Sequence, residues 1–186
     1  MNGLFEDYFN IKQSEITFNS LLGNENLSQE RVNELKYYHM LIIPIRDYRN
    51  NEGYFFYSAS RDFYLFCKNE NPENHFEFYT EKNEYKELLL NSSELYLGTL
   101  LINHILLPIA SNLLLKFITE KLTNNDDKVI LKIIIENNET NSSEEIEFRG
   151  TKKDFKEKII KTLNTYTKDG KTIVPGQNGT KINVLY

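Results

Sequence analysis

Two short groups of side chains carry the functional groups that binding or catalysis requires. The first group is Ser58, Ser60, Arg61 and Asp62. Hydroxyl, guanidinium and carboxylate groups on one turn can bind an anion or a carboxylate. The second group is Asn103 and His104, where an imidazole can bind a ligand or transfer a proton near neutral pH. We take these six residues as candidate binding residues, although ordinary turn chemistry and a core histidine would explain them without any function.

The remaining histidines and the cysteine lack the spacing of a metal site. His39, His75 and His104 are far apart in the chain, and Cys67 is the one cysteine. Zinc sites are usually recognised from closely spaced pairs of ligands, which this sequence does not have. We therefore predict no metal and no cofactor, and interpret Cys67 as a small buried hydrophobic residue. Because no catalytic motif stands out either, the sequence favours a protein that is not an enzyme.

Composition restricts the class of protein further. The chain has 186 residues, of which 40% are hydrophobic, and a net charge of -5. A globular fold can form from such a chain without disulfides, and the acidic balance argues against nucleic acid as a partner. A single cysteine and an N-terminus without a basic and then apolar signal segment indicate a cytoplasmic protein.

Secondary-structure elements must position these candidate residues. The most prominent signal for such an element is one long apolar stretch. No charged residue occurs from Leu95 to Leu115 if His104 is neutral. We expect one long helix from about residue 93 to 122, buried on all sides in its first half. Proline removes an N–H group and clashes with the carbonyl four residues earlier, so we expect a kink near Pro108. Beyond the kink, Leu114 and Phe117 fall on one arc of an amphipathic helix.

This stretch is also long enough to cross a membrane. Its polar residues and the absence of a basic flanking cluster argue against that interpretation. We favour the core helix of a soluble domain. Two alternatives stay open: membrane contact through residues 95–117, and a surface buried only in a homo-oligomer.

Before this stretch, the chain is predicted to be rich in β-strands. Branched and aromatic runs, separated by short turns, predict an antiparallel meander with strands in residues 40–48, 54–57, 63–67 and 75–79. The two aromatic strands would each leave one aromatic face uncovered, which is typical of a binding surface. Ser28 is predicted to cap a short helix, and a second helix is expected over residues 80–90.

The last third of the chain has clearer patterns. Residues 128–136 are apolar on both faces, which predicts a central strand, and residues 145–149 alternate and are expected to pair with it. Thr151 is predicted to cap a helix that buries Phe155, Ile159 and Leu163, and a hairpin follows over residues 172–185.

These patterns indicate an α+β fold: an antiparallel β meander, a kinked central helix, and then a β-hairpin–helix–β-hairpin unit. We expect one domain, 1–186, with a β-rich part, 1–92, and a second part, 93–186. Our leading hypothesis is a cytoplasmic, bacterial accessory or regulatory protein that binds another protein. The alternatives are an enzyme with a dispersed site at His104 or the Ser58–Asp62 turn, and a membrane-associated protein.

Overall fold

The computed structural model describes residues 6–23, 27–73, 75–82, 84–90 and 92–168, with the short strands Val174–Pro175 and Ile182–Asn183. The fold is mixed α+β, built on a six-stranded sheet. In spatial order the strands are β1 (Tyr8–Ser14), β9 (Ser142–Thr151), β8 (Lys128–Asn137), β7 (Leu95–Asn103), β2 (Met40–Ile43) and β5 (Phe76–Phe78). The β7–β8 and β2–β5 pairs are parallel, and the other pairs are antiparallel. Strands from both halves of the chain therefore share one sheet.

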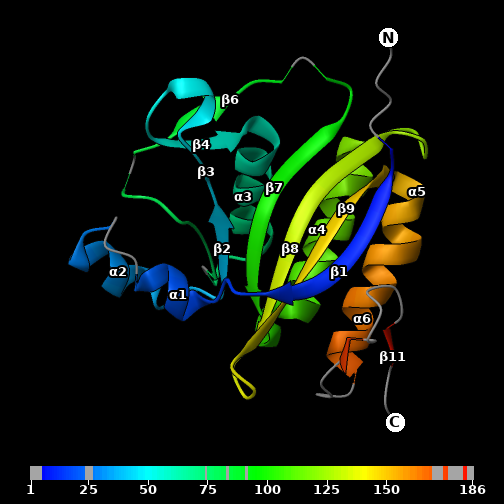
Figure 1. Cartoon of the computed structure of the whole chain (residues 1–186). Coiled ribbons are helices and arrows are strands. Elements are labelled where there is room, and N and C mark those ends of the chain that lie inside the picture. The colour runs from blue at the N-terminus through cyan, green and yellow to red at the C-terminus, as the bar shows by residue number, and fades with distance from the viewer. Residues whose placement is uncertain are drawn as a thin grey trace.

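Helices from the middle and the end of the chain cover one face of this sheet (Figure 1). They are α3 (Ser58–Glu70), α4 (Leu107–Lys121) and a continuous C-terminal helix made of α5 (Lys152–Asp154), η3 (Phe155–Ile160) and α6 (Lys161–Lys168). Alternate strand residues such as Leu100, Ile133 and Ile146 point into this layer and are completely buried. Because α4 joins the parallel strands β7 and β8, these three elements form a β–α–β crossover.

The opposite face of the sheet is covered at one end by α1 (Phe18–Leu22) and α2 (Gln29–Leu35). Leu41, Leu101 and Ile134 pack there against α2. A second sheet of three strands, β3 (Ile45–Arg46), β4 (Tyr54–Tyr57) and β6 (Lys86–Leu88), lies beside β7 and α3. Short 3-10 helices, η1 (Tyr48–Asn50) and η2 (His104–Leu106), complete the connections.

The prediction of one kinked helix over residues 93–122 is wrong. Residues 95–103 form strand β7, and α4 begins at Leu107 with Pro108 in its first turn. Proline is favoured there because its missing N–H would have no partner within the helix anyway, so Pro108 starts a helix instead of bending one. Leu114 and Phe117 are buried as predicted and Ile118 is buried beside them, while Asn112 and Lys116 are exposed. Over the described parts of the chain, no helix combines the length and apolar character needed to span a membrane.

Strands form in three of the four segments predicted for the first half, 40–48, 54–57 and 75–79, but their arrangement as an antiparallel meander is wrong, since β2 and β5 are parallel and β4 belongs to the second sheet. Residues 58–70 form helix α3, so the expected Ser58–Asp62 turn and the following strand do not exist as such. The buried positions Ser60, Phe63 and Cys67 recur at helical spacing and pack on the sheet. The helix expected over residues 80–90 is absent from the described residues there, because residues 86–88 pair with β4 as strand β6.

The predictions for the last third and for the short helix capped by Ser28 are confirmed. Strands β8 and β9 form the expected hairpin, with Ile146 and Phe148 in the core. Thr151 caps the C-terminal helix by accepting a hydrogen bond from the Asp154 N–H, and Ser28 caps α2 from the Arg31 N–H. The final hairpin appears as β10 (Val174–Pro175) paired with β11 (Ile182–Asn183), and the rest of residues 172–185 lies outside the described residues.

The contact between β9 and α6 makes stability dependent on pH. The Tyr166 hydroxyl donates to Glu144, whose carboxylate is nearly buried. Burial raises the pKa of Glu144 above its ordinary value, although the bond from Tyr166 partly opposes this. The folded state therefore holds a proton that the unfolded state has already lost, and the free energy of unfolding falls as pH rises through that window.

We expect Glu144→Gln to become more stable relative to the wild type as pH rises from below 4.5 to neutrality. Glutamine still accepts the Tyr166 hydrogen bond but does not ionise. Urea unfolding of both proteins at several pH values measures the difference, with the exposed Glu139→Gln as the matched control. A difference that does not change with pH would contradict this assignment.

Candidate functional site

A β-bulge in β7 creates the candidate site. The pairing of β7 with β8 shifts between Tyr96 and Gly98, and Gly98 has a φ of +68°. A side chain at Gly98 would be strained there, and its Cβ would lie 3.3 Å from the Ser60 hydroxyl oxygen. The Ser60 hydroxyl donates to the Leu97 carbonyl at 3.0 Å, which fixes the first turn of α3 against the bulge. The absent side chain leaves room for a recess between the two sheets.

The recess has a volume of 220 Å³ and mostly apolar walls. Aromatic residues of β4 and β7 form one side of it, and the Tyr57 and Tyr96 rings lie 5.3 Å apart. Burial raises the pKa of both phenols, with smaller contributions from Tyr48 for Tyr57 and from Glu94 for Tyr96. Both rings are therefore neutral at physiological pH.

The polar side of the recess belongs to the uncovered part of the large sheet. Register places Thr99, Lys132 and Glu147 in one row across β7, β8 and β9. Lys132 lies 3.0 Å from Glu147 and 2.9 Å from Glu145, and Lys12 of β1 contacts the same two carboxylates. Burial lowers the pKa of Lys132, but its bonds to the glutamates outweigh this and raise it, and Lys132 in turn lowers the pKa of Glu147. Lys132 and Glu147 are therefore both ionised, and their opposite charges balance.

The size of the recess limits what it can hold. A cavity of about 150 Å³ accommodates benzene, whereas sites for cofactors and drug-sized ligands usually measure about 300–1,000 Å³. At 220 Å³ the recess matches one aromatic or branched aliphatic side chain. Its balanced ion pairs provide no excess charge for a phosphate group. The arrangement is suited to holding an apolar group next to hydrogen-bonding groups.

The first group of predicted site residues lies in the first turns of α3, and one member reaches the recess. Ser60 lines it, while its hydroxyl is bonded to the backbone of β7. Arg61 lies 4.0 Å from Glu87 of β6, and Asp62 forms an ion pair of 2.7 Å with Lys121 of α4. These contacts join α3 to its neighbours. A binding role for Ser58, Ser60, Arg61 and Asp62 stays a prediction.

The second predicted group lies at the other end of β7. The Asn103 side chain accepts a hydrogen bond from the Ile105 N–H at 3.1 Å and so caps η2. The His104 Nδ1 atom is buried and makes no hydrogen bond with the described residues. The structure thus does not bring the two predicted groups together, and the functional role of Asn103 and His104 also stays a prediction.

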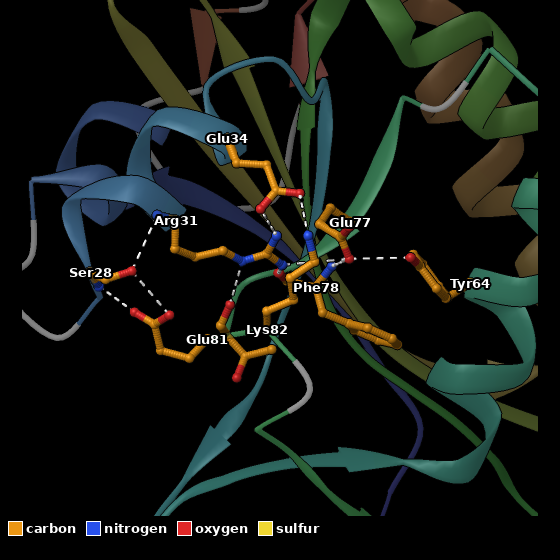
Figure 2. A network of polar contacts seen from close by, with 9 residues as sticks. Ser28, Arg31, Glu34, Tyr64, Glu77, Phe78, Glu81 and Lys82 are labelled. Atoms are coloured by element: carbon orange, nitrogen blue, oxygen red, sulfur yellow. Dashed lines mark hydrogen bonds and ion pairs between the residues drawn. The ribbon is translucent and has the colours of Figure 1, made fainter.

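Sequence reasoning missed the network around Arg31, which Figure 2 shows between α2, α3 and the edge strand β5. The guanidinium group donates to the Thr80 carbonyl at 2.7 Å and to the Phe78 carbonyl at 3.1 Å. It also forms an ion pair of 2.8 Å with Glu34 and lies 3.7 Å from Glu77. A hollow of 290 Å³ lies beside this network, and several of its charged lining groups already have partners: Arg31 contacts Glu77, Lys82 pairs with Glu34, and Glu81 binds Ser28. We assign the network a structural role: it anchors α2 to the sheet.

A pair of histidines is the second feature that the sequence spacing did not predict. His39 and His75 precede the parallel strands β2 and β5, and their Nδ1 atoms lie 3.1 Å apart. Burial lowers the pKa of His39, with a smaller contribution from His75. This pair lies near Asn103, whose N–H donates to the His39 carbonyl at 2.8 Å.

Comparison of the chain with protein-family models, with curated proteins and with solved structures finds no match.

Proposed function

We propose that this protein is an accessory protein without catalytic activity that binds a partner protein by holding one apolar side chain of that partner in the β7 recess. The observation that carries the proposal is the recess itself, which combines aromatic walls with an ion-paired polar row on a sheet face. Protein interfaces often concentrate their binding energy in one buried aromatic or aliphatic anchor.

The chemistry of the recess supports a peptide chain over other ligands. Tyr57, Tyr96 and Phe55 provide apolar contact area for the anchor side chain. The Lys132 and Glu147 groups next to them can donate to and accept from the polar backbone beside that anchor. Their charges cancel, which fits a neutral peptide segment better than a nucleotide or a nucleic acid.

The proposal is tested with small probes that carry only the anchor. We expect N-acetyl-L-phenylalaninamide and N-acetyl-L-leucinamide to bind with dissociation constants in the range of about 1–10 mM. N-acetylglycinamide lacks the side chain and should bind at least about tenfold more weakly. Saturation-transfer NMR measures all three affinities on the intact chain.

A variant that fills the recess serves as the critical comparison. Thr99 lines the recess, so Thr99→Trp should occupy it and abolish binding of both apolar probes. Thr119→Trp makes the same substitution at an exposed position of α4 and should bind like the wild type. The chain has no native tryptophan, so the indole emission of each variant also reports whether the new side chain is buried. Unchanged binding by a folded Thr99→Trp protein, or equal binding of the glycine probe, would rule out the recess as the site.

A further inference from the structure

The backbone places His39 and His75 side by side. The His39 and Met40 N–H groups both donate to the His75 carbonyl at 3.0 Å, where β2 and β5 begin their parallel pairing. The Asn103 N–H donates to the His39 carbonyl from the other side. Three strands therefore fix the positions of the two residues, and the side chains need little rearrangement to act together.

The two imidazole rings direct the same nitrogen toward each other. Their centroids are 5.1 Å apart, the planes are inclined by 70°, and the Nδ1 atoms are separated by 3.1 Å. The Glu73 carboxylate lies 3.2 Å from Nε2 of His75 and accepts a hydrogen bond from it. A proton held on Nε2 leaves the His75 Nδ1 atom with a free lone pair. In the neutral pair, His39 must then donate its Nδ1 proton to His75.

We propose that His39 and His75 form an open binding site for a divalent first-row transition metal ion, with both Nδ1 atoms as ligands. Imidazole nitrogens bind zinc at about 2.0–2.1 Å. Two such bonds that meet at an angle between 90° and the tetrahedral value place the nitrogens about 2.8–3.4 Å apart. The observed 3.1 Å lies in this range, so an ion can enter without movement of the backbone.

The role of Glu73 follows from the same geometry. A metal-binding histidine usually donates its other ring N–H to a carboxylate, which fixes the tautomer and increases the basicity of the ligand. Glu73 occupies this position for His75. Binding the ion displaces the Nδ1 proton of His39, and exchange with solvent restores a proton at the Nε2 atom, so His39 binds as a neutral imidazole. Glu73 is thus a positioning residue, and it does not itself bind the metal.

The two histidines provide only two ligands, so the remaining coordination positions of the metal ion are open. Among the residues that the structure describes, no group of three or more histidine, cysteine or acidic side chains is placed to bind one ion. Both histidines are partly exposed, so water or a group from another molecule can fill the remaining coordination positions. Neutral imidazoles favour copper, nickel and zinc over magnesium and calcium.

The test uses the intact chain with Zn²⁺ and Ni²⁺ as probes in isothermal titration calorimetry. We expect one ion of each metal to bind, with no heat from Mg²⁺. His39→Gln and His75→Gln should each weaken binding by at least about 100-fold, and Glu73→Gln by about tenfold. His104→Gln is the matched control and should bind within about twofold of the wild type. Wild-type affinity in both His39→Gln and His75→Gln, or no saturable binding by the wild type, would overturn the proposal.

A second measurement avoids dependence on the folding of the variants. Long-range ¹H–¹⁵N spectra of the histidine rings are recorded on the wild type as Zn²⁺ is added. The Nδ1 resonances of His39 and His75 should shift together, and those of His104 should stay unchanged. A shift of His104 alone, or none in any ring, would assign the metal elsewhere or exclude it.

Discussion

Replacing Arg31 with methionine should lower the free energy of unfolding by about 2–4 kcal/mol. The Arg31 side chain is 5% exposed and satisfies the carbonyls of Phe78 and Thr80. Methionine fills a similar volume but donates no hydrogen bond, so both carbonyls lose their charged donor in a buried place. The Glu34 carboxylate also loses the partner that lowers its pKa. This ion pair contributes only a small part of the effect, because the Glu34 side chain is partly solvated.

Urea unfolding of wild type, Arg31→Met and Lys82→Met measures this effect. Lys82 also pairs with Glu34, at 3.6 Å, but its side chain is 73% exposed. Its replacement should cost less than about 1 kcal/mol, because exposed ion pairs contribute little. If Arg31→Met is as stable as Lys82→Met, the network in Figure 2 does not anchor α2 to β5.

The second large effect is expected at the α3–α4 contact. Phe117 of α4 is 2% exposed, and its ring lies 5.2 Å from that of Phe63 and 5.4 Å from that of Phe66. Phe117→Ala would leave a cavity between two helices that other contacts hold in place. We therefore expect a loss of about 3–5 kcal/mol in the free energy of unfolding.

The matched control for this variant is Thr119→Ala, two residues further along the exposed side of α4. It should change stability by less than about 0.5 kcal/mol. Thermal and urea unfolding of the wild type, Phe117→Ala and Thr119→Ala measure these changes in stability. A cost below about 1 kcal/mol for Phe117→Ala would mean that α3 does not pack on α4 through its aromatic residues.

The last third of the chain could be predicted because each element there shows a single period with a start signal. Strand residues 145–149 alternate between apolar and polar, and the C-terminal helix has a clear apolar stripe behind Thr151. The same holds for the second half of the apolar stretch, where only one side of α4 is buried. When only one face of a helix or strand is covered, its apolar residues recur at the period of that element and can be recognised in the sequence.

The first half of that stretch could not be predicted, because β7 is covered on both faces. Leu100 packs under the helices, and Leu101 packs against α2, so no alternation is visible. The apolar run then continues without a break into α4. The prediction for the α3 segment was wrong because its aromatic run resembles a strand. The helical spacing of Ser60, Phe63 and Cys67 is hard to recognise because one of the three residues is polar.

The candidate site was predicted only in part. The aromatic strand that contains Tyr57 indicated a binding surface, and an isolated glycine such as Gly98 is a usable signal for a bulge. The row of Lys132 and Glu147 depends on the β8–β9 register. The His39–His75 pair depends on parallel pairing between β2 and β5, which residue spacing does not reveal.

The binding recess is the central claim, and the amide footprint of the phenylalanine probe tests it most directly. ¹H–¹⁵N spectra of the wild type are recorded as N-acetyl-L-phenylalaninamide is added. The largest shifts should fall on recess residues of three strands: Tyr57 in β4, Gly98 and Thr99 in β7, and Lys132 in β8. Largest shifts at exposed apolar residues elsewhere, such as Tyr37 or Ile105, would contradict the account.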